Sequence, residues 1–372
     1  VFKEIHGQLY NFSKSEYKLA LNLYLNHFNI SCKLKGDALR KCRHPLLLRF
    51  FCEAYGNTDG INCELGGISE IRLKKLFDDY WERKITNTKQ ILGYRTGRDI
   101  EKFLYSLAFY MRSKHSFSIP LSIIQETTEI KDLESEKSIY IRTLDEDIIL
   151  EQNSNDDGNQ QIVFVYDAFM EYTIAREIVE DYFSDPIKNL SIKHMIKNIL
   201  KEQGSYKSVF GIVSFLCVIF AVNRKIPIWQ IVLDEGKEWH LSIVLGLSQL
   251  TINEFDQSAF ECLYILASSI NSFIQKQVLI ISLRLRNLNE PKLLQVWEKL
   301  FYNSSSKIRI LARREIVRLA QKGDHDAIRV MLEALKSPDS VISACALFGL
   351  YEINIDISDK LRSLSSSKDI FI

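Results

Sequence analysis

Apolar residues recur every three or four positions along most of this chain of 372 residues, and this spacing predicts a mainly α-helical fold. Between about 14 and 27 they fall on one helical face, and Ser13 and Glu16 have the spacing of a capping box at the start of that helix. Further helices are expected over 36–43, 45–55 and 69–85, with a loop over 56–67. Residues 1–95 therefore predict a small helical domain.

The pattern changes over residues 96–185. A helix from about 98 has an apolar stripe, and shorter helices are expected after Pro120 and over 134–143. Two β-rich runs, 148–150 and 162–165, then flank the turn-rich stretch 153–159. Three helices followed by a hairpin is the order of a winged helix, so we expect a winged-helix domain with a β-hairpin wing.

Residues 186–372 predict a helical superhelix with an internal repeat. The pattern around Ile308 returns around Val341, with a further helix expected over 327–335 between them. Repeats of this length are typical of helix pairs that stack into a solenoid, and they are close to HEAT repeats.

Composition excludes several classes of protein. The 48 basic and 47 acidic residues give a net charge of +1, which offers no overall attraction to nucleic acid or to an anionic membrane. The seven cysteines lack the spacing of a zinc site and indicate reduced thiols in a cytoplasmic protein. The longest apolar run, over 210–222, is too short to span a bilayer and predicts a buried helix.

The chain opens on Val1, and we expect it to be part of a longer protein.

The segment Arg43-His44-Pro45-Leu46-Leu47-Leu48 carries the first candidate site. A proline is well tolerated in the first turn of a helix, where its missing N–H has no partner to lose. Pro45 is therefore either an ordinary start of a helix or part of a rigid apolar wall beside a ligand.

A second segment, Phe164-x-Tyr166-x-x-Phe169-x-Glu171-Tyr172-x-x-Ala175, follows about 120 residues later. Together with the Pro-Leu-Leu-Leu helix it resembles NACHT-type ATPases of the STAND class, which include NOD-like receptors and bacterial antiphage sensors. The order of helical domain, winged helix and superhelix is also similar to that family across nearly the whole chain. The opening from Tyr10 to Glu16 resembles the family's exit from its ATPase core, so the resemblance implies that residues 1–95 hold the end of that core and the small helical domain.

The resemblance implies that Pro45 and Leu46 contact the adenine of a bound nucleotide. Tyr166 stands where the family has a histidine that reaches the ADP phosphates, and His44 replaces the family's Asn or Gly before the proline. A phenol is uncharged at pH 7, whereas a protonated imidazole carries a positive charge. An inhibitory contact through Tyr166 is therefore expected to be weaker or to work differently.

The chain contains no G-x-x-x-x-G-K-[ST] motif and no acidic strand end placed to hold Mg²⁺. No catalytic residue is assigned, although the parent protein resembles an ATPase. The cofactor implied is ATP or ADP, with Mg²⁺ bound mainly by residues outside this chain. We expect the P-loop and any effector domain upstream of Val1.

The implied function is the regulatory and sensor portion of an ATPase switch in antiphage or innate immunity. A protein trigger, such as a phage or pathogen protein, would bind the superhelix and permit nucleotide exchange and homo-oligomerisation. No membrane or nucleic-acid partner is expected. The alternative is a non-enzymatic HEAT-like scaffold whose winged helix makes protein contacts. A P-loop shortly upstream would favour the switch.

Several residues have two interpretations. The stretch 131–144 mixes basic and acidic residues and Asp156 and Asp157 follow in the wing, so DNA binding there is not favoured. Glu171 could pair with Arg176, and Asp167 could cap a helix over 168–183.

Two sets of residues in the superhelix could each form a surface for a partner or have an ordinary structural role. They are the basic residues Lys307, Arg309, Arg313, Arg314 and Arg318, and the tryptophans Trp229, Trp239 and Trp297.

Overall fold

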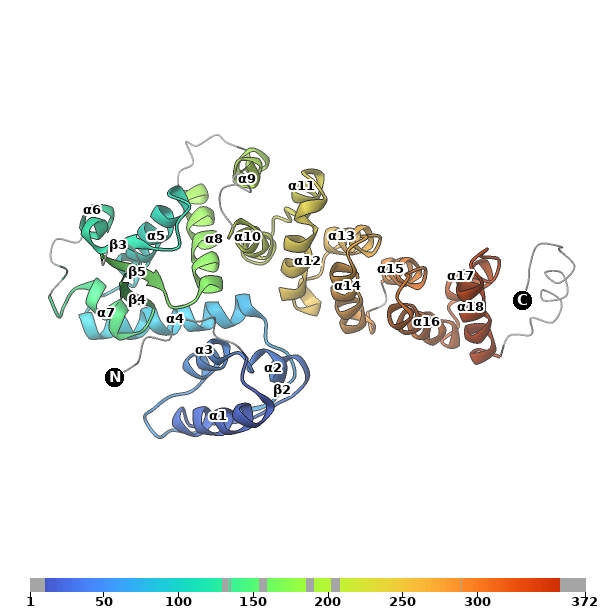
Figure 1. Cartoon of the computed structure of the whole chain (residues 1–372), viewed down its shortest axis with the longest axis horizontal. Helices are drawn as coiled ribbons and strands as arrows, with labels where there is room; N and C mark the ends of the chain where they lie inside the picture. The colour runs from blue at the N-terminus through green and yellow to red at the C-terminus, as the bar shows by residue number, and fades with distance from the viewer. Residues whose placement is uncertain are drawn as a thin grey trace, which may run out of the picture. The chain divides into compact units, whose positions relative to one another are not determined.

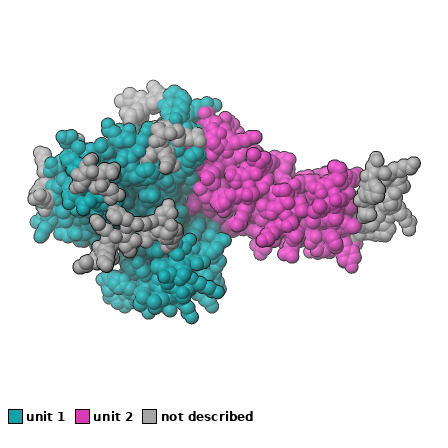
Figure 2. Space-filling model, in the orientation of Figure 1, with its two compact units in different colours: residues 1–223 teal, residues 224–372 magenta. Residues whose placement is uncertain are grey.

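The computed structural model describes residues 11–128, 133, 135–153, 159–184, 191–201, 208–288 and 290–354. Within them the chain is mainly helical, as predicted, with few and short strands (Figure 1). It divides into two compact units, Val1–Asn223 and Arg224–Ile372 (Figure 2). The domain boundaries expected after residues 95 and 185 both lie inside the first unit.

The first part of unit 1 combines short helices with a two-stranded parallel sheet. The predicted capping box is present, since Ser13 N donates to Glu16 Oε2 at 2.8 Å and Glu16 N donates to Ser13 Oγ at 3.3 Å. The elements are α1 (Lys14–His27), β1 (Ile30–Leu34), α2 (Gly36–Lys41), α3 (Pro45–Tyr55) and β2 (Cys63–Ile68).

The expected loop over 56–67 is wrong in its second half, because β2 begins at Cys63. β2 pairs in parallel with β1, from Ile30 opposite Cys63 to Leu34 opposite Ile68. The register shifts after Ser31, and Gly66 takes a positive φ of 65° there, a conformation that glycine adopts at no steric cost. Glycines that look like loop residues in the sequence therefore form an irregular strand.

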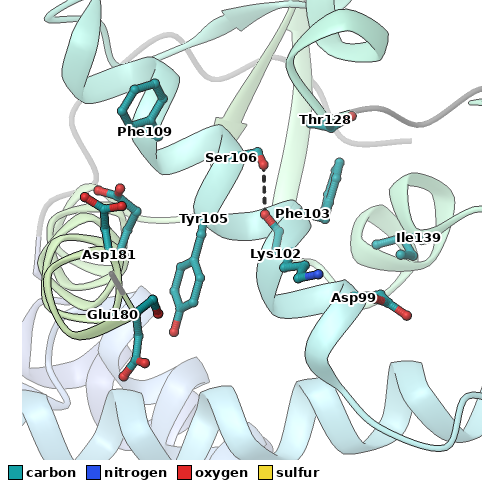
Figure 3. Close-up of a pocket in the computed structure, with 12 residues that line it drawn as sticks. Asp99, Lys102, Phe103, Tyr105, Ser106, Phe109, Thr128, Ile139, Glu180 and Asp181 are labelled. Atoms are coloured by element: carbon teal, nitrogen blue, oxygen red, sulfur yellow. Dashed lines mark hydrogen bonds between the residues drawn. The ribbon is translucent and has the colours of Figure 1, made fainter. Parts of the chain in front are cut away.

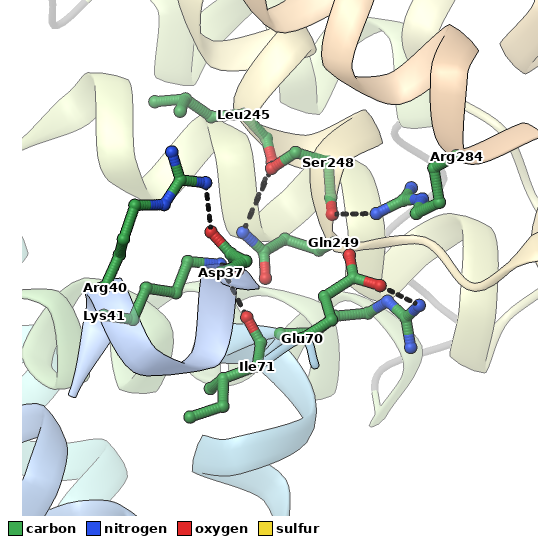
Figure 4. A network of polar contacts seen from close by, with 10 residues as sticks. Asp37, Arg40, Lys41, Glu70, Ile71, Leu245, Ser248, Gln249 and Arg284 are labelled. Atoms are coloured by element: carbon green, nitrogen blue, oxygen red, sulfur yellow. Dashed lines mark hydrogen bonds and ion pairs between the residues drawn. The ribbon is translucent and has the colours of Figure 1, made fainter. Parts of the chain in front are cut away.

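Helix α4 (Leu73–Leu92) is longer than the helix expected over 69–85 and ends at Gly93, whose φ of 71° is left-handed. The segment before it holds α2 in place: the N–H groups of Asp37 and Ala38 donate to the carbonyl of Ser69, and Lys41 Nζ donates to the carbonyl of Ile71 (Figure 4). Helix α5 (Arg98–Ser113) follows and buries its predicted apolar stripe.

A three-stranded antiparallel sheet of order β3-β5-β4 lies beside α5, α6 and α7. Ile119 of β3 faces Ile162 of β5, and Ile149 of β4 faces Phe164 of β5. Residues 154–158, in the expected wing with Asp156 and Asp157, lie outside the described residues. The elements are β3 (Ile119–Pro120), the 3₁₀ turn η1 (Leu121–Ile123), α6 (Ile124–Thr128), α7 (Ile139–Asp145), β4 (Ile149–Asn153) and β5 (Gln160–Phe164).

The described helices that follow in unit 1 are α8 (Asp167–Ser184), α9 (Ile192–Lys201) and α10 (Val209–Asn223). Asp167 is the first residue of α8 rather than its cap, because the N–H groups of Phe169 and Met170 donate to the carbonyl of Tyr166. Helix α10 is almost wholly buried, as expected for the apolar run, and packs on α8. Across the described residues, no helix has the length and apolarity needed to cross a membrane.

An aromatic core joins α3, α4 and α8. The ring of Phe169 lies 5.5 Å from that of Phe50, 5.4 Å from Phe77 and 5.2 Å from Tyr80, measured between centroids. Edge and tilted contacts of this kind stabilise aromatic clusters beyond their buried area. The segment after β5 is thereby fixed against α3.

Unit 2 is built from helix pairs that follow one another. Helices α11, α13 and α15 contact in series, as do α12, α14, α16 and α18, and each pair is joined by its own contacts. The helices are α11 (Trp229–Asp234), α12 (His240–Gln249), α13 (Gln257–Ala267), α14 (Ser272–Leu285), α15 (Pro291–Phe301), α16 (Ser306–Gln321), α17 (His325–Ala334) and α18 (Ser340–Glu352). Arg284 ties α14 to the end of α12 by donating to the carbonyl of Ser248 at 3.0 Å (Figure 4).

Both open interpretations in unit 2 are resolved by burial. Trp229, Trp239 and Trp297 are at most 2% exposed and belong to the core. The five basic residues of α16 do not form one ridge, because Arg309 is buried with its guanidinium donating to the carbonyl of Asn303 at 2.7 Å.

All seven cysteines carry free thiols.

Candidate functional site

The start of α3 and the start of α8 lie side by side. The rings of His44 and Tyr166 are 5.5 Å apart between centroids, and the ring of Phe50 lies 6.1 Å from Tyr166. Pro45 is the first residue of α3 and Leu46 the second, and both are half-buried, as is Tyr166. Two segments about 120 residues apart in the sequence therefore form one surface.

His44 has an unusual environment at the N-cap of α3. Its side chain makes no capping hydrogen bond, and its Nδ1 atom is buried with no hydrogen-bond partner among the described residues. Burial lowers the pKa of this imidazole below its ordinary value, because a charged ring would lose hydration. His44 is therefore neutral at pH 7 and retains an unused polar atom beside Tyr166.

Tyr166 ends the segment after β5 and accepts backbone hydrogen bonds from the first turn of α8. Burial raises the pKa of its phenol, and the carboxylates of Glu171 and Asp167 raise it further. The phenol is therefore neutral and can exchange hydrogen bonds without adding charge.

Glu171 lies on α8 against the start of α10. Its carboxylate accepts a hydrogen bond from Ser208, and a Cβ on Gly211 would lie only 2.0 Å from Glu171 Oε2. Burial raises the pKa of this carboxyl to about 7, partly opposed by the hydrogen bond from Ser208. A titratable group with a pKa near neutrality thus joins α8 to α10 one turn beyond Tyr166.

The expected pairing of Glu171 with Arg176 is wrong. The Arg176 guanidinium stacks on the ring of Trp81 at 4.6 Å and donates to the hydroxyl of Tyr172 at 2.9 Å. It also approaches carboxylates of α4 and α5, at 3.9 Å from Asp78 and 3.7 Å from Glu101. Because Arg176 points to these two helices, it anchors α8 on the side away from Glu171.

A chain of alternating charges links α3, α4 and the turn between α7 and β4. Arg49 pairs with both Asp147 and Glu53, and Lys84 pairs with Glu53 at 2.7 Å and with Glu146 at 3.1 Å. Glu146 and Asp147 are two of the acidic residues that follow the stretch 131–144. Their charges are balanced by Arg49 and Lys84, so their first role is structural.

Among the cavities lined by described residues, three lie in unit 1, and the residues that line these three do not include Pro45, Leu46 or Tyr166. The first, of about 670 Å³, lies between α5, α6, α7 and α8 (Figure 3). Asp99 and Lys102 line it from α5, and Glu180 and Asp181 line it from α8. The cavity has more carboxylates than lysines in its lining, so its net negative charge would repel phosphate groups.

The other two cavities contain the charged clusters already described. One of about 440 Å³ includes Trp81 and Arg176, and one of about 600 Å³ includes Arg49 and Asp147. No group of three or more His, Cys, Asp or Glu side chains suited to a metal ion occurs within the described residues.

The sequence named Pro45, Leu46 and Tyr166, and the structure adds His44 as the residue that connects the two segments. The Nδ1 atom of His44 has no hydrogen-bond partner because of neighbours that are distant in the sequence, so no local pattern could have shown this. Glu171 had a visible signal, since Met170 and Tyr172 on either side of it in α8 are buried apolar residues.

No known protein family model matches this chain, and no curated protein sequence matches it.

Proposed function

We propose that this chain is the regulatory and sensor portion of a NACHT-like STAND ATPase. In this proposal, residues 11–184 close over an adenine nucleotide whose phosphates and Mg²⁺ are held mainly by other parts of the protein. Unit 2 would then be the sensor.

The order of elements supports this assignment. Helix α5, the short β3, helices α6 and α7 and the hairpin β4–β5 follow the order of a winged helix, and the sheet order β3-β5-β4 is compatible with that fold. The serial contacts of α11 to α18 are those expected of HEAT-like pairs.

The contact between His44 and Tyr166 is the observation on which the proposal chiefly rests. In the family that the sequence resembles, the position of Tyr166 carries a histidine that reaches the phosphates. Here the imidazole is supplied from position 44, beside Pro45, while position 166 supplies a neutral phenol. The Nδ1 atom of His44 is buried without a hydrogen-bond partner, which leaves an unsatisfied polar atom at the site.

The proposed switch is a population shift between closed and open states. Pro45 and Leu46 would pack on the adenine and stabilise the closed state. A trigger that binds the open state better would shift the equilibrium towards it, and nucleotide exchange would follow. Each ligand can shift the equilibrium only by the difference in its affinity for the two states.

The test is nucleotide retention by the full-length natural protein. Purified under native conditions and then denatured, it should release ADP or ATP, measured by chromatography. Pro45→Ala and His44→Ala should each speed ADP release about tenfold, because each removes a contact of about 1.4 kcal/mol to the bound nucleotide. Tyr166→Phe should change the rate less, because the ring stays and only the hydroxyl is lost.

Pro291→Ala is the matched control, because Pro291 is also the first residue of a helix, α15, in unit 2. It should leave ADP release unchanged. If Pro45→Ala and Pro291→Ala behave alike, the assignment of Pro45 fails. If the protein neither carries nor binds an adenine nucleotide, the switch is rejected and the scaffold alternative takes its place.

A further inference from the structure

Three helices of unit 2 together expose six large apolar side chains within the described residues. Helices α14, α16 and α18 are the second members of their pairs and contact one another in series. In Figure 1 they follow one another along one side of this unit, with α13, α15 and α17 along the other. We call the exposed surface of α14, α16 and α18 the second-helix face.

The apolar residues of the second-helix face repeat with helical spacing. On α18 the exposed positions include three large apolar residues at i, i+7 and i+10, two of them 62% and 77% exposed. The residues of the face are Phe273, Ile280, Ile310, Val341, Phe348 and Tyr351. In the described α13, α15 and α17, Ile265 is the large apolar residue that the first helices expose, and Tyr302 is exposed at the C-cap of α15. Exposed large apolar residues that gather on one side of a protein mark interaction sites.

Charge is divided between the same two sets of helices. Helices α14, α16 and α18 carry seven lysines and arginines and two glutamates, whereas α13, α15 and α17 carry three basic and four acidic residues. Of the two glutamates, Glu315 is buried and Glu352 pairs with Arg313 at 3.0 Å. The second-helix face is therefore basic as well as apolar.

Three of its basic side chains have no carboxylate of their own. Within the described residues, Lys276, Lys307 and Arg314 form no ion pair, and all three are exposed. Arg329 on α17 differs, since it lies 3.0 Å from Asp326 and 3.9 Å from Glu333. Lys292 and Lys299 on α15 also form no ion pair within the described residues, but their ammonium groups lie over the ring of Tyr264, 5.1 and 5.5 Å from its centroid. Carboxylates from a partner would complete the charge pattern of the second-helix face.

The combination favours a protein partner over nucleic acid. Phosphate backbones are bound by dense basic surfaces, yet Arg309, Arg313 and Arg318 on α16 are already engaged by groups of this chain. Exposed Phe and Tyr side chains, with Ile and Val beside them, are instead typical anchors of protein interfaces.

We propose that the second-helix face binds a protein segment that presents large apolar side chains flanked by carboxylates. This inference rests on the sensor role proposed above, and it specifies the chemistry of the trigger. The apolar residues supply the affinity, and Lys276, Lys307 and Arg314 select acidic segments and speed their association.

The test uses the whole chain and a displayed library of random peptides of about 15 residues, long enough for an amphipathic helix. Enriched peptides should combine acidic with large apolar residues. Synthesised and titrated by fluorescence anisotropy, they should bind Ile280→Ser about tenfold more weakly than the unaltered chain. Ile265→Ser is the matched control, because both isoleucines are 40% exposed, on the adjacent helices α14 and α13.

Charge is tested in the same titration. Lys276→Glu should weaken binding several-fold, whereas Arg329→Glu, on α17, should leave it unchanged. Circular dichroism of every variant confirms that the fold is retained, since all four side chains lie on the surface.

Three outcomes overturn the proposal. The library could yield no enriched peptide, the enriched peptides could lack acidic residues, or Ile265→Ser could weaken binding as much as Ile280→Ser. Tight binding of a short DNA duplex or RNA strand that depends on Lys276 and not on Ile280 would assign the face to nucleic acid instead. None of these results depends on nucleotide retention, so this proposal and the ATPase switch can fail separately.

Discussion

Glu171 shows how strongly a single residue can depend on its surroundings. In the sequence it is one acidic residue on a helix, but in the structure its carboxylate is enclosed by Ser208 and the glycine at 211. His44 shows the opposite shift, because burial lowers the pKa of its imidazole. In both cases burial favours the neutral form of the side chain.

The raised pKa of Glu171 makes the stability of unit 1 depend on pH. The folded protein holds this proton up to about pH 7, whereas the unfolded chain releases it near the ordinary value of 4.5. The stabilisation from this group is therefore complete below that ordinary pKa and is lost as the pH rises through about 7. Glu171→Gln should raise the free energy of unfolding at about pH 8 by about 1–2 kcal/mol and have little effect at about pH 4.

Urea denaturation at these two pH values measures the difference. Glu126→Gln is the control, because Glu126 is exposed on α6, and it should follow the unaltered protein at both pH values. A Glu171→Gln variant that loses stability at the higher pH would show that the carboxylate is charged and needed in the folded state.

At the scale of elements, the sequence correctly predicted the start of those helices that begin with a local sequence signal. The capping box at Ser13 and the proline at the start of α3 set helix starts where the structure has them, because both act within one turn. The parallel pairing of β1 with β2 was missed, since its hydrogen bonds join residues about 30 positions apart. The length of α4 was underestimated because its last turns lack a clear apolar stripe.

Lys84 on α4 gives a test of how the elements of unit 1 are held together. Its ammonium lies between Glu53 of α3 and Glu146 beside α7, and all three side chains are mostly buried. Lys84→Met should lower the free energy of unfolding by about 3 kcal/mol, because two buried carboxylates would lose their shared partner.

Lys75→Met is the matched control on the same helix. Lys75 is 65% exposed and pairs, within the described residues, with Asp79 alone, so its loss should cost less than about 0.5 kcal/mol. Chemical denaturation of both variants gives the comparison. Equal losses in the free energy of unfolding would mean that the buried ion pairs of Lys84 stabilise the protein no more than the surface ion pair of Lys75.

At the scale of the whole molecule, the two units have separate cores. Unit 2 contains Trp229, Trp239 and Trp297, all buried, while Trp81 lies in unit 1. The described helices of unit 2 also bury their apolar faces on one another in series. Stacked pairs of this kind are stabilised by their nearest neighbours.

A fragment of residues 224–372 should therefore fold alone. We expect a helical circular dichroism spectrum, the blue-shifted fluorescence of buried tryptophan and a single cooperative unfolding transition. The control is the same fragment with Trp297→Ala, which should be less stable by about 3–5 kcal/mol because a large buried side chain is removed. Fluorescence of exposed tryptophan from the unaltered fragment would show that unit 2 needs unit 1 to fold.

The sequence by itself determined the helical class, the main helix boundaries and the two segments around Pro45 and Tyr166. These depend on spacing, capping and turn chemistry, which act between residues close in the chain. The tertiary structure alone decided that His44 meets Tyr166, that Glu171 faces α10 rather than Arg176, and that the exposed apolar residues of unit 2 gather on α14, α16 and α18. Burial, pKa and surface patches depend on which distant segments pack together, and no local pattern contains that information.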